Sequence, residues 1–541
     1  MSLCYNLTVR NAVRDQIARA AGTVMAAFAI SQLAGLVRRI VVLEAFGISA
    51  ELDAFVAANR VSETLFNLVA GGALGSAFIP TFTALLVKDD RAAAWRLASA
   101  VVNLVLVILS ALAALAAVFA PQIVRYALAS GFSANPAQEA LTIALLRIQL
   151  ISAVLFGLSG LAMAVLNSHQ VFLIPALTPA MYQLGLIFGA VVLSKEYGIY
   201  GLAYGVVIGA ALHLMLQVPA LLRLQGVYSL TLGWRNAAVG EVLRLMGPRL
   251  VGVAVVQLNF WVNTWLASYM AGGSLAAIEN GFALMLMAQA ALAQSVATAA
   301  MPTLAGQYAL GQLDDMRRTL AASLRGVLWL AAPAAVGLMV LRTPIIALLY
   351  QRGQFEARST ELVAWALLWY AAGLVGHALL EVLARAFYAL HDTRTPVLVG
   401  AAAMVLNAGL SFALAASFAR LGWMPHGGLA LANSLATAIE ALALLVLMRR
   451  RLNGLEGRRL LRCALQAGAS TLVMASALGG WLSLTAERSN WLIVGGGVGL
   501  GMAVYGLTAA ALDFSQARHL IRAVLLRLTH LSGRMFCGSW L

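Results

Sequence analysis

Long apolar stretches, separated by short polar breaks, run along almost the whole chain. Most have about 20 residues or more, the length that an α-helix needs to cross the hydrocarbon core of a membrane. We therefore predict an all-α polytopic membrane protein with about fourteen transmembrane helices. The predicted spans are 19–46, 52–86, 92–119, 138–167, 171–194, 199–224, 238–271, 274–305, 313–342, 360–391, 395–418, 426–447, 460–484 and 491–512.

Composition agrees with this interpretation and excludes a soluble domain. Of the 541 residues, 62% are hydrophobic and only 11% are charged, whereas soluble proteins have about 25% charged residues. The short alternating segments of a transmembrane β-barrel are absent from the sequence. The three cysteines are far apart and match no metal or redox spacing, so we expect no metal site.

The net charge of +15 is distributed between the apolar stretches rather than over one soluble face. Nucleic acid is therefore not an expected partner. Lysine and arginine concentrate in alternate connections, which predicts that both termini are cytoplasmic. The most basic connection, RRRLNGLEGRRLLR (449–462), is expected to lie against anionic phospholipid headgroups.

The chain also repeats itself at an offset of roughly 225 residues. IPTFTALL (79–86) resembles MPTLAGQY (301–308), and GLAYGVVIGAALHLMLQ (201–217) resembles GLALANSLATAIEALAL (428–444). Parallel repeats of this kind occur in transporters that hold substrate between two lobes. The predicted organisation is a cytoplasmic N-terminal segment (1–18), two similar six-helix lobes (19–224 and 225–447), a basic loop with two extra helices (448–512) and a basic cytoplasmic tail (513–541).

Polar residues follow one face of the second predicted span. Asp53, Arg60, Glu63, Asn67 and Gly71 have spacings of three, four or seven residues, which place them on the same side of an α-helix. Charged side chains are costly against lipid, so this face should contact protein or water.

Further polar residues lie in the first, seventh and eighth spans, which correspond to the second in the repeat or adjoin it. They are Gln32, Arg38 and Arg39 in 19–46, Asn263 in 238–271 and Glu279 in 274–305. A shared polar cavity explains their concentration. Alternatives remain open: the arginines could extend to the headgroups at the helix end, and Asn and Gln could only join neighbouring helices.

Two further residue pairs have two interpretations each. Arg60 and Glu63 form either part of the cavity or a local ion pair. His213, which the repeat aligns with Glu440, is either a buried hydrogen-bonding partner or a site of proton or ion coupling. No nucleotide-binding, hydrolase or metal motif is present in the sequence, so we expect a transporter and not an enzyme.

Several segments resemble the MurJ (MviN) lipid II flippases of the multidrug/oligosaccharidyl-lipid/polysaccharide exporter superfamily. The resemblance extends over about 20–450. The matching segments are AFGISAELDAFVAANRV (45–61), GGALGSAFIPTF (71–82), MGPRLVGVAVVQLN (246–259), LLYQRGQFEARST (348–360) and FYALHDTRTPVLVG (387–400).

The resemblance implies a flippase of the bacterial inner membrane that moves an undecaprenyl-pyrophosphate-linked peptidoglycan precursor outward by alternating access. The expected partners are lipid II or a related polyprenyl-pyrophosphate glycolipid, anionic phospholipids and proteins of cell-wall synthesis. No cofactor is expected, although the membrane potential or a gradient of Na⁺ or H⁺ could drive transport. Other readings are a flippase for another polyprenyl-linked glycan, a drug/cation antiporter, and a scaffold for cell-wall enzymes that does not transport.

The resemblance also assigns candidate site residues. Arg38 matches the family's second arginine in the first span, and Asp53 matches its cavity aspartate. The sequence departs from the family pattern at Gln32 and at Asn67, where the family has basic residues, and it lacks the basic residue expected in 274–305. Arg39 and Arg60 could compensate in part.

Some members of the family bind a cation between three helices of the second lobe. Asn407 occupies a matching position in this chain, and Ser411 stands where a carboxylate is expected. Asn407 therefore joins His213 and Glu440, which the repeat suggested, as a candidate for ion coupling.

Overall fold

The computed structural model describes residues 27, 29–69 and 72–512, and within these ranges it contains helices and no strands. Each of the fourteen predicted spans coincides with helical structure in its described part. Among the described residues, ten helices are long and apolar enough to cross a membrane, and counting each of two bent helix pairs as one span raises this number to 12. The fold class is therefore confirmed. The predicted segments 1–18 and 513–541, and Gly71 of the polar face, lie outside the described residues.

The described chain forms two compact helical units. The first comprises residues up to Ala276 together with Arg352–Ser359, and the second comprises Ala277–Gln351 and the residues from Thr360 onward. These units differ from the predicted lobes, because Ala237–Ser268 (α11) packs against Ala50–Val69 (α2) and Gly72–Val87 (α3). The repeat-based lobes stay a prediction.

The first unit is a bundle around α6, the longest helix in it. In it, α6 packs against α2, α3, α4 and α9, and α7 packs against α9. Its elements are a helix over 29–46, α2 (Ala50–Val69), α3 (Gly72–Val87), α4 (Arg91–Val118), α5 (Ala120–Gln122), η1 (Ile123–Leu128), η2 (Ser130–Ala134), α6 (Pro136–Ser168), α7 (Leu173–Phe188), η3 (Gly189–Leu193), α8 (Ser194–Tyr197), α9 (Ile199–Met215), α10 (Val218–Arg223) and α11 (Ala237–Ser268).

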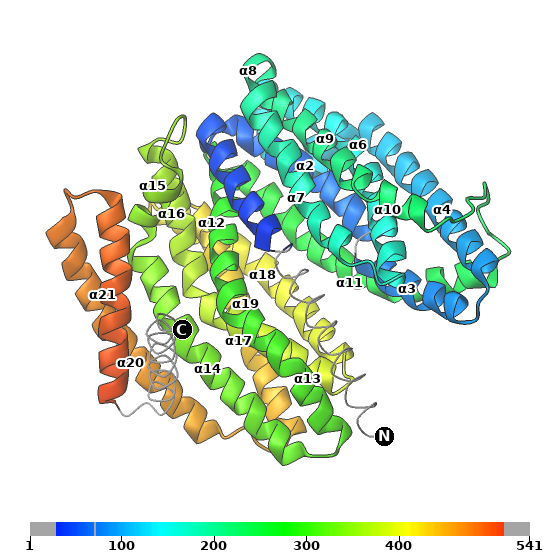
Figure 1. Ribbon diagram of the computed structural model, residues 1–541. Helices are drawn as coiled ribbons and strands as arrows, with labels where there is room; N and C mark the ends of the chain where they lie inside the picture. Colours follow the sequence, from blue (N-terminus) through cyan, green and yellow to red (C-terminus); the bar gives the residue numbers. More distant parts are fainter. Residues whose placement is uncertain (1–26, 28, 70–71, 513–541) are drawn as a thin grey trace, which may run out of the picture. The chain divides into compact units, whose positions relative to one another are not determined.

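Helices α7 and α9 lie side by side in Figure 1, and glycines bring their backbones together. A Cβ atom added at Gly185 would lie 2.2 Å from the Cα of Gly209, and one added at Gly205 would lie 2.9 Å from the Cα of Gly189. Small residues at four-residue spacing permit this close packing in membranes, where van der Waals contact drives helix association.

Replacing Gly209 with leucine should lower the thermal unfolding midpoint of the purified protein in detergent. The added side chain has no space, and overpacking costs about 1–3 kcal/mol or more. Gly499→Leu on α21 is the matched control, since a Cβ atom there meets nothing within 4 Å. Equal midpoints for the two variants would contradict the close packing of α7 and α9.

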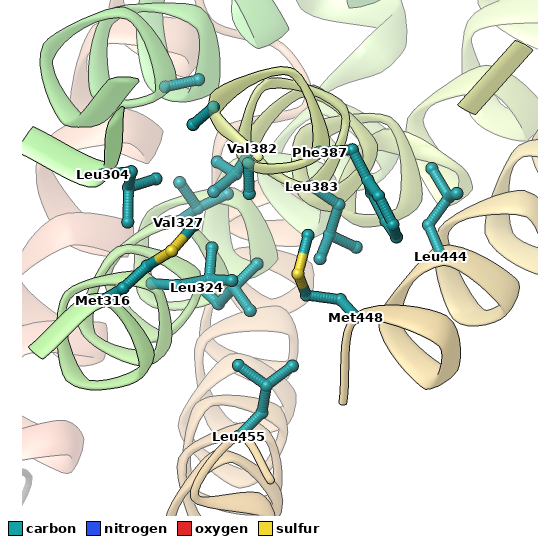
Figure 2. Close-up of a cluster of buried hydrophobic side chains, with 14 of the residues drawn as sticks. Leu304, Met316, Leu324, Val327, Val382, Leu383, Phe387, Leu444, Met448 and Leu455 are labelled. Carbon is teal, nitrogen blue, oxygen red and sulfur yellow. The ribbon is translucent and has the colours of Figure 1, made fainter. Parts of the chain in front are cut away.

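The second unit has an apolar core between α13, α14, α17 and α19. Figure 2 shows Leu324 and Val327 of α14 facing Val382 and Leu383 of α17 in this buried cluster. The elements of this unit are α12 (Ser274–Gln289), η4 (Ala290–Gln294), α13 (Ser295–Ala309), α14 (Leu313–Val340), α15 (Arg342–Tyr350), α16 (Ala357–Ala372), α17 (Leu374–Ala389), α18 (Arg394–Arg420), α19 (His426–Arg451), α20 (Gly457–Thr485) and α21 (Asn490–Ala511). Only the first turns of α12 and α16 group with the first unit.

The basic connection between α19 and α20 is attached to α14 through a carboxylate. Glu456 pairs with Arg325 of α14 at 2.6 Å and with Arg459 at 3.2 Å. The hydrogen bond from Arg325 holds the pKa of Glu456 below its ordinary value. This ion pair is strongest above the ordinary pKa of glutamate and is lost as the pH falls through the lowered value.

Candidate functional site

The first unit contains a cavity of about 570 Å³ between α2, α6, α7, α9 and α11. Both charged and aromatic side chains form its walls. The lining residues are Asn59, Arg60, Ser62, Glu63, Phe66, Asn67, Ser152, Phe156, Gly160, Met163, Pro179, Tyr182, His213, Gln257 and Phe260.

The polar face of α2 forms the charged wall of the cavity. Arg60, Glu63 and Asn67 all line it, as their helical spacing predicts. The Arg60 guanidinium lies 3.0 Å from the Glu63 carboxylate and 4.8 Å from the centre of the Phe260 ring. The Glu63 side chain is 44% exposed, whereas that of Arg60 is only 7% exposed. The glutamate is therefore accessible from the cavity, and the arginine is held between it and an aromatic ring.

The Glu63 carboxylate also accepts a hydrogen bond of 2.8 Å from the amide nitrogen of Asn59. Asn59 and Arg60 both lie about one helical turn before Glu63, so two neighbouring side chains of α2 hold the carboxylate. Such a pair presents a donor and an acceptor side by side and can bind a polar group that has both.

The opposite wall combines aromatic rings with neutral polar groups. The His213 ring shares a hydrogen bond of 2.6 Å with the hydroxyl of Ser159, to which Gln217 also donates. Beside the cavity, between α2 and α11, the hydroxyl of Thr64 accepts a hydrogen bond of 2.8 Å from the indole of Trp261 and donates to Gln257, which lines the cavity. His213 thus has a structural partner and lines the cavity as well, so both of its predicted interpretations remain.

Arg38, Arg39 and Gln32 lie on the helix over 29–46, outside the set of lining residues. This helix packs on α7, where the hydroxyl of Ser31 donates to the carbonyl of Ala176. Arg38 and Arg39 are half-buried and Gln32 is exposed. The Arg38 Nε atom is buried and has no hydrogen-bond partner among the described residues.

Asp53 lies at the start of the same polar face, but the structure places it at the N-terminus of α12 and not among the lining residues. Its carboxylate accepts hydrogen bonds of 2.6 Å from the backbone N–H of Gly273 and 2.7 Å from that of Ala276. The residue is 2% exposed. A carboxylate at a helix N-terminus satisfies otherwise unpaired N–H groups and interacts favourably with the helix dipole.

The remaining candidates lie elsewhere. Asn263 is half-buried on α11 and does not line the cavity. Glu279 on α12 is half-buried and belongs to the second unit, as do buried Asn407 on α18 and half-buried Glu440 on α19. The Glu440 carboxylate would lie 3.1 Å from a Cβ atom at Gly400, so it packs against α18. No cluster of three or more potential metal ligands occurs within the described ranges.

A polar contact that the sequence analysis missed joins two distant segments of the first unit. The loop Arg352–Ser359 lies on residues 44–48: the N–H of Gln354 donates to the carbonyl of Glu44 at 2.8 Å, and the hydroxyl of Ser359 accepts from the N–H of Ile48 at 3.1 Å. Gly47 and Gly353 have φ values of +59° and +56°, and backbone atoms lie within 2.6 Å of where their Cβ atoms would be. Only glycine fits such positions. The sequence analysis singled out the segment LLYQRGQFEARST, which contains Gly353, but nothing in it indicated that residues 44–48 are its contact.

The helical architecture and the polar cavity together define a multi-helix membrane transporter. The family model for "Lipid II flippase MurJ" matches residues 42–494. The chain therefore belongs to the MurJ family of lipid II flippases.

Relatives support this membership over most of the chain. The lipid II flippase MurJ of Burkholderia cenocepacia is 30% identical over 80% of this chain and 84% of its own length. The probable lipid II flippase MurJ of Vibrio cholerae is 29% identical over 88% of this chain and 92% of its own.

Solved structures agree with the family. A lipid II flippase MurJ in an inward closed conformation matches with a TM-score of 0.77 and 25% identity, over 92% of this chain and 99% of that one. An inward-facing multidrug MATE transporter of the MOP superfamily matches with a TM-score of 0.67 over 79% of this chain and 96% of that one, at 15% identity, and shares the fold.

Proposed function

We propose that this protein translocates lipid II from the inner to the outer leaflet of the bacterial cytoplasmic membrane by alternating access. The observation that carries the proposal is the MurJ family match over residues 42–494. Related proteins of nearly the same length are named lipid II flippases. The protein is a transporter in this proposal, and both termini are cytoplasmic.

The chemistry of the described residues fits such a substrate. A pyrophosphate-linked headgroup cannot cross about 30 Å of hydrocarbon unaided. Arginine binds phosphate oxygens in a fork and stays charged. Arg60 lines the cavity, and Arg38 is half-buried on the helix that packs on α7. Outward movement of negative charge is favoured by about 2.3 kcal/mol per charge per 100 mV of inside-negative potential. The membrane potential, or coupling to Na⁺ or H⁺ through Asn407, His213 or Glu440, would drive transport without ATP.

A second candidate function is transport of another polyprenyl-linked oligosaccharide. The substitutions at Gln32 and Asn67 favour it, because these positions are basic in the family pattern that the sequence otherwise resembles. The headgroup would then differ, whereas the pyrophosphate and the polyprenyl chain would be the same.

The test is rescue of a bacterium whose own lipid II flippase can be switched off. We expect the wild-type chain to restore growth and to raise the amount of lipid II that an added, membrane-impermeant enzyme can cleave at the outer leaflet. The double variant Arg38→Ala/Arg39→Ala should fail at equal membrane levels, since it removes both half-buried cations of the first helix.

The matched control is Arg449→Ala/Arg450→Ala, another adjacent arginine pair, which is exposed in the last turn of α19. It should rescue like the wild type. Equal rescue by the Arg38/Arg39 variant would remove these arginines from the mechanism. A well-inserted wild type that never raises outer-leaflet lipid II, but moves another polyprenyl-pyrophosphate glycan in liposomes, would establish the second candidate.

A further inference from the structure

A second cavity of the first unit is a groove of about 1040 Å³ between α4 and the linker over 224–236. The linker joins α10 to α11. Apolar side chains and two arginines share the groove. Its lining residues are Arg96, Asn103, Leu106, Val107, Tyr228, Leu230, Thr231, Leu232, Gly233, Trp234, Arg235 and Asn236.

The linker wall is fixed to α4 by one buried asparagine. The side-chain amide nitrogen of Asn103 donates hydrogen bonds to the carbonyls of Ser229 and Thr231 at 3.2 and 2.8 Å. Its side-chain oxygen accepts a hydrogen bond of 2.6 Å from the hydroxyl of Tyr228. The hydroxyl of Ser99 accepts a further hydrogen bond from the N–H of Ser229. The groove is therefore a built feature of the fold and not a chance gap beside a loose linker.

The groove changes in polarity along α4. Arg96 lies in the second turn of this helix, and Leu106 lies ten residues further on, which corresponds to about 15 Å along the helix axis. Leu106 and Val107 are 39% and 54% exposed on the most apolar of the candidate membrane spans. One end of the groove is thus cationic, and the other is open to the hydrocarbon core.

The linker itself exposes apolar side chains beside its arginine. Leu230 is 90% exposed and Trp234 is 75% exposed, and Arg235 follows directly. Exposed Leu and Trp next to Arg are typical of a segment at the membrane interface, where the apolar part is covered by lipid and the polar part contacts headgroups.

The charge of the groove favours an anionic lipid over a zwitterionic one. Arg96 and Arg235 are exposed, and neither has a hydrogen bond or ion pair among the described residues. No lining residue of the groove is acidic. Two guanidinium groups at the interface would bind a phosphate by charge-assisted hydrogen bonds, and a zwitterionic lipid would gain less from them than an anionic one.

We propose that this groove, the linker groove, binds one anionic phospholipid. The phosphate is held by Arg96 and Arg235, and an acyl chain lies along Leu106 and Val107. The site is separate from the proposed transport cavity, and it does not depend on the identity of the transported lipid.

Photolabelling of the full-length protein in phosphatidylcholine nanodiscs tests the proposal. The probe is phosphatidylglycerol with a photoreactive group in one acyl chain, used at a low mole fraction. We expect adducts on peptides from α4 around 103–107 and from the linker over 224–236. Arg96→Gln/Arg235→Gln should reduce labelling of these peptides roughly tenfold or more, because it removes two cations that contact one phosphate. Labelling of other peptides should persist.

The control variant Arg223→Gln/Arg244→Gln removes two exposed arginines that flank the linker and do not line the groove. It should keep most of the labelling, and an equal loss would show general attraction to the membrane and overturn the site. Equal labelling by a phosphatidylcholine probe would also overturn it. Competition by undecaprenyl pyrophosphate, without competition by unlabelled phosphatidylglycerol, would assign the groove to the transported lipid and contradict the proposal.

Discussion

Replacing Asp53 with alanine is expected to destabilise the protein and to abolish rescue of a strain without its own flippase. Its carboxylate is 2% exposed and accepts two short hydrogen bonds at the start of α12. The alanine variant leaves the N–H groups of Gly273 and Ala276 buried without an acceptor. Each such loss costs about 1–3 kcal/mol, so the thermal unfolding midpoint should fall strongly.

Glu51→Ala is the control for this prediction, because Glu51 lies in the same first turn of α2 and is exposed. It should leave both unfolding and rescue unchanged. An Asp53→Ala protein with normal unfolding and normal rescue would refute the capping role. Normal unfolding with lost rescue would instead indicate that Asp53 acts on the substrate, as the family resemblance implies.

Arg60→Ala should lower the rate of transport about ten- to hundredfold, which corresponds to loss of one charge-assisted contact of about 1.5–3 kcal/mol. The arginine is the cation that lines the cavity, and Phe260 and Glu63 hold its guanidinium in place. Arg60→Lys should recover only part of the rate, because an ammonium group cannot bind phosphate in a fork. The measurement is the appearance of lipid II at the outer leaflet at equal membrane levels.

A charge exchange separates the ion pair from the position of the cation. Arg60→Glu/Glu63→Arg keeps both charges on α2 but moves the cation by almost one helical turn. If Arg60 and Glu63 only neutralise each other, the exchanged variant should transport normally. We expect transport to remain low, because the cation at position 60 binds substrate in our proposal.

The matched control for the Arg60 variants is Arg317→Ala. Arg317 pairs with Asp314 at the same three-residue spacing and the same distance of 3.0 Å, at the exposed start of α14. It should transport at the wild-type rate. A similar loss in Arg317→Ala would show that removing any such pair harms the protein.

The helices and part of the site could be predicted because both depend on local periodicity. Apolar length alone predicted helical structure in the described part of every expected span, and a spacing of three to seven residues placed Arg60, Glu63 and Asn67 on one wall of a cavity. The opposite, neutral wall of the cavity could not be predicted. Tyr182 and Phe156 come from α7 and α6, and aromatic residues in apolar spans look the same whether they line a cavity or pack in a core.

Contacts between distant segments account for the other differences. Asp53 carries the same sequence signal as Arg60, but its partners are N–H groups some 220 residues further along the chain. A helix N-terminus has no side-chain signature that would reveal such a distant acceptor. The grouping of α11 with the first unit also depends on contacts between distant segments. A sequence repeat indicates which segments are similar, and it does not indicate which helices pack together.

The loop that lies on residues 44–48 has a topological consequence. Because Arg352–Ser359 belongs to the first unit while the residues on both sides of it belong to the second, the backbone passes between the units three times, after Ala276, Gln351 and Ser359. A single cut in the chain therefore cannot release either unit with all of its own residues. The eight-residue loop, in which Gly353 admits no side chain, is thus the part of the first unit that lies between two segments of the second one along the chain.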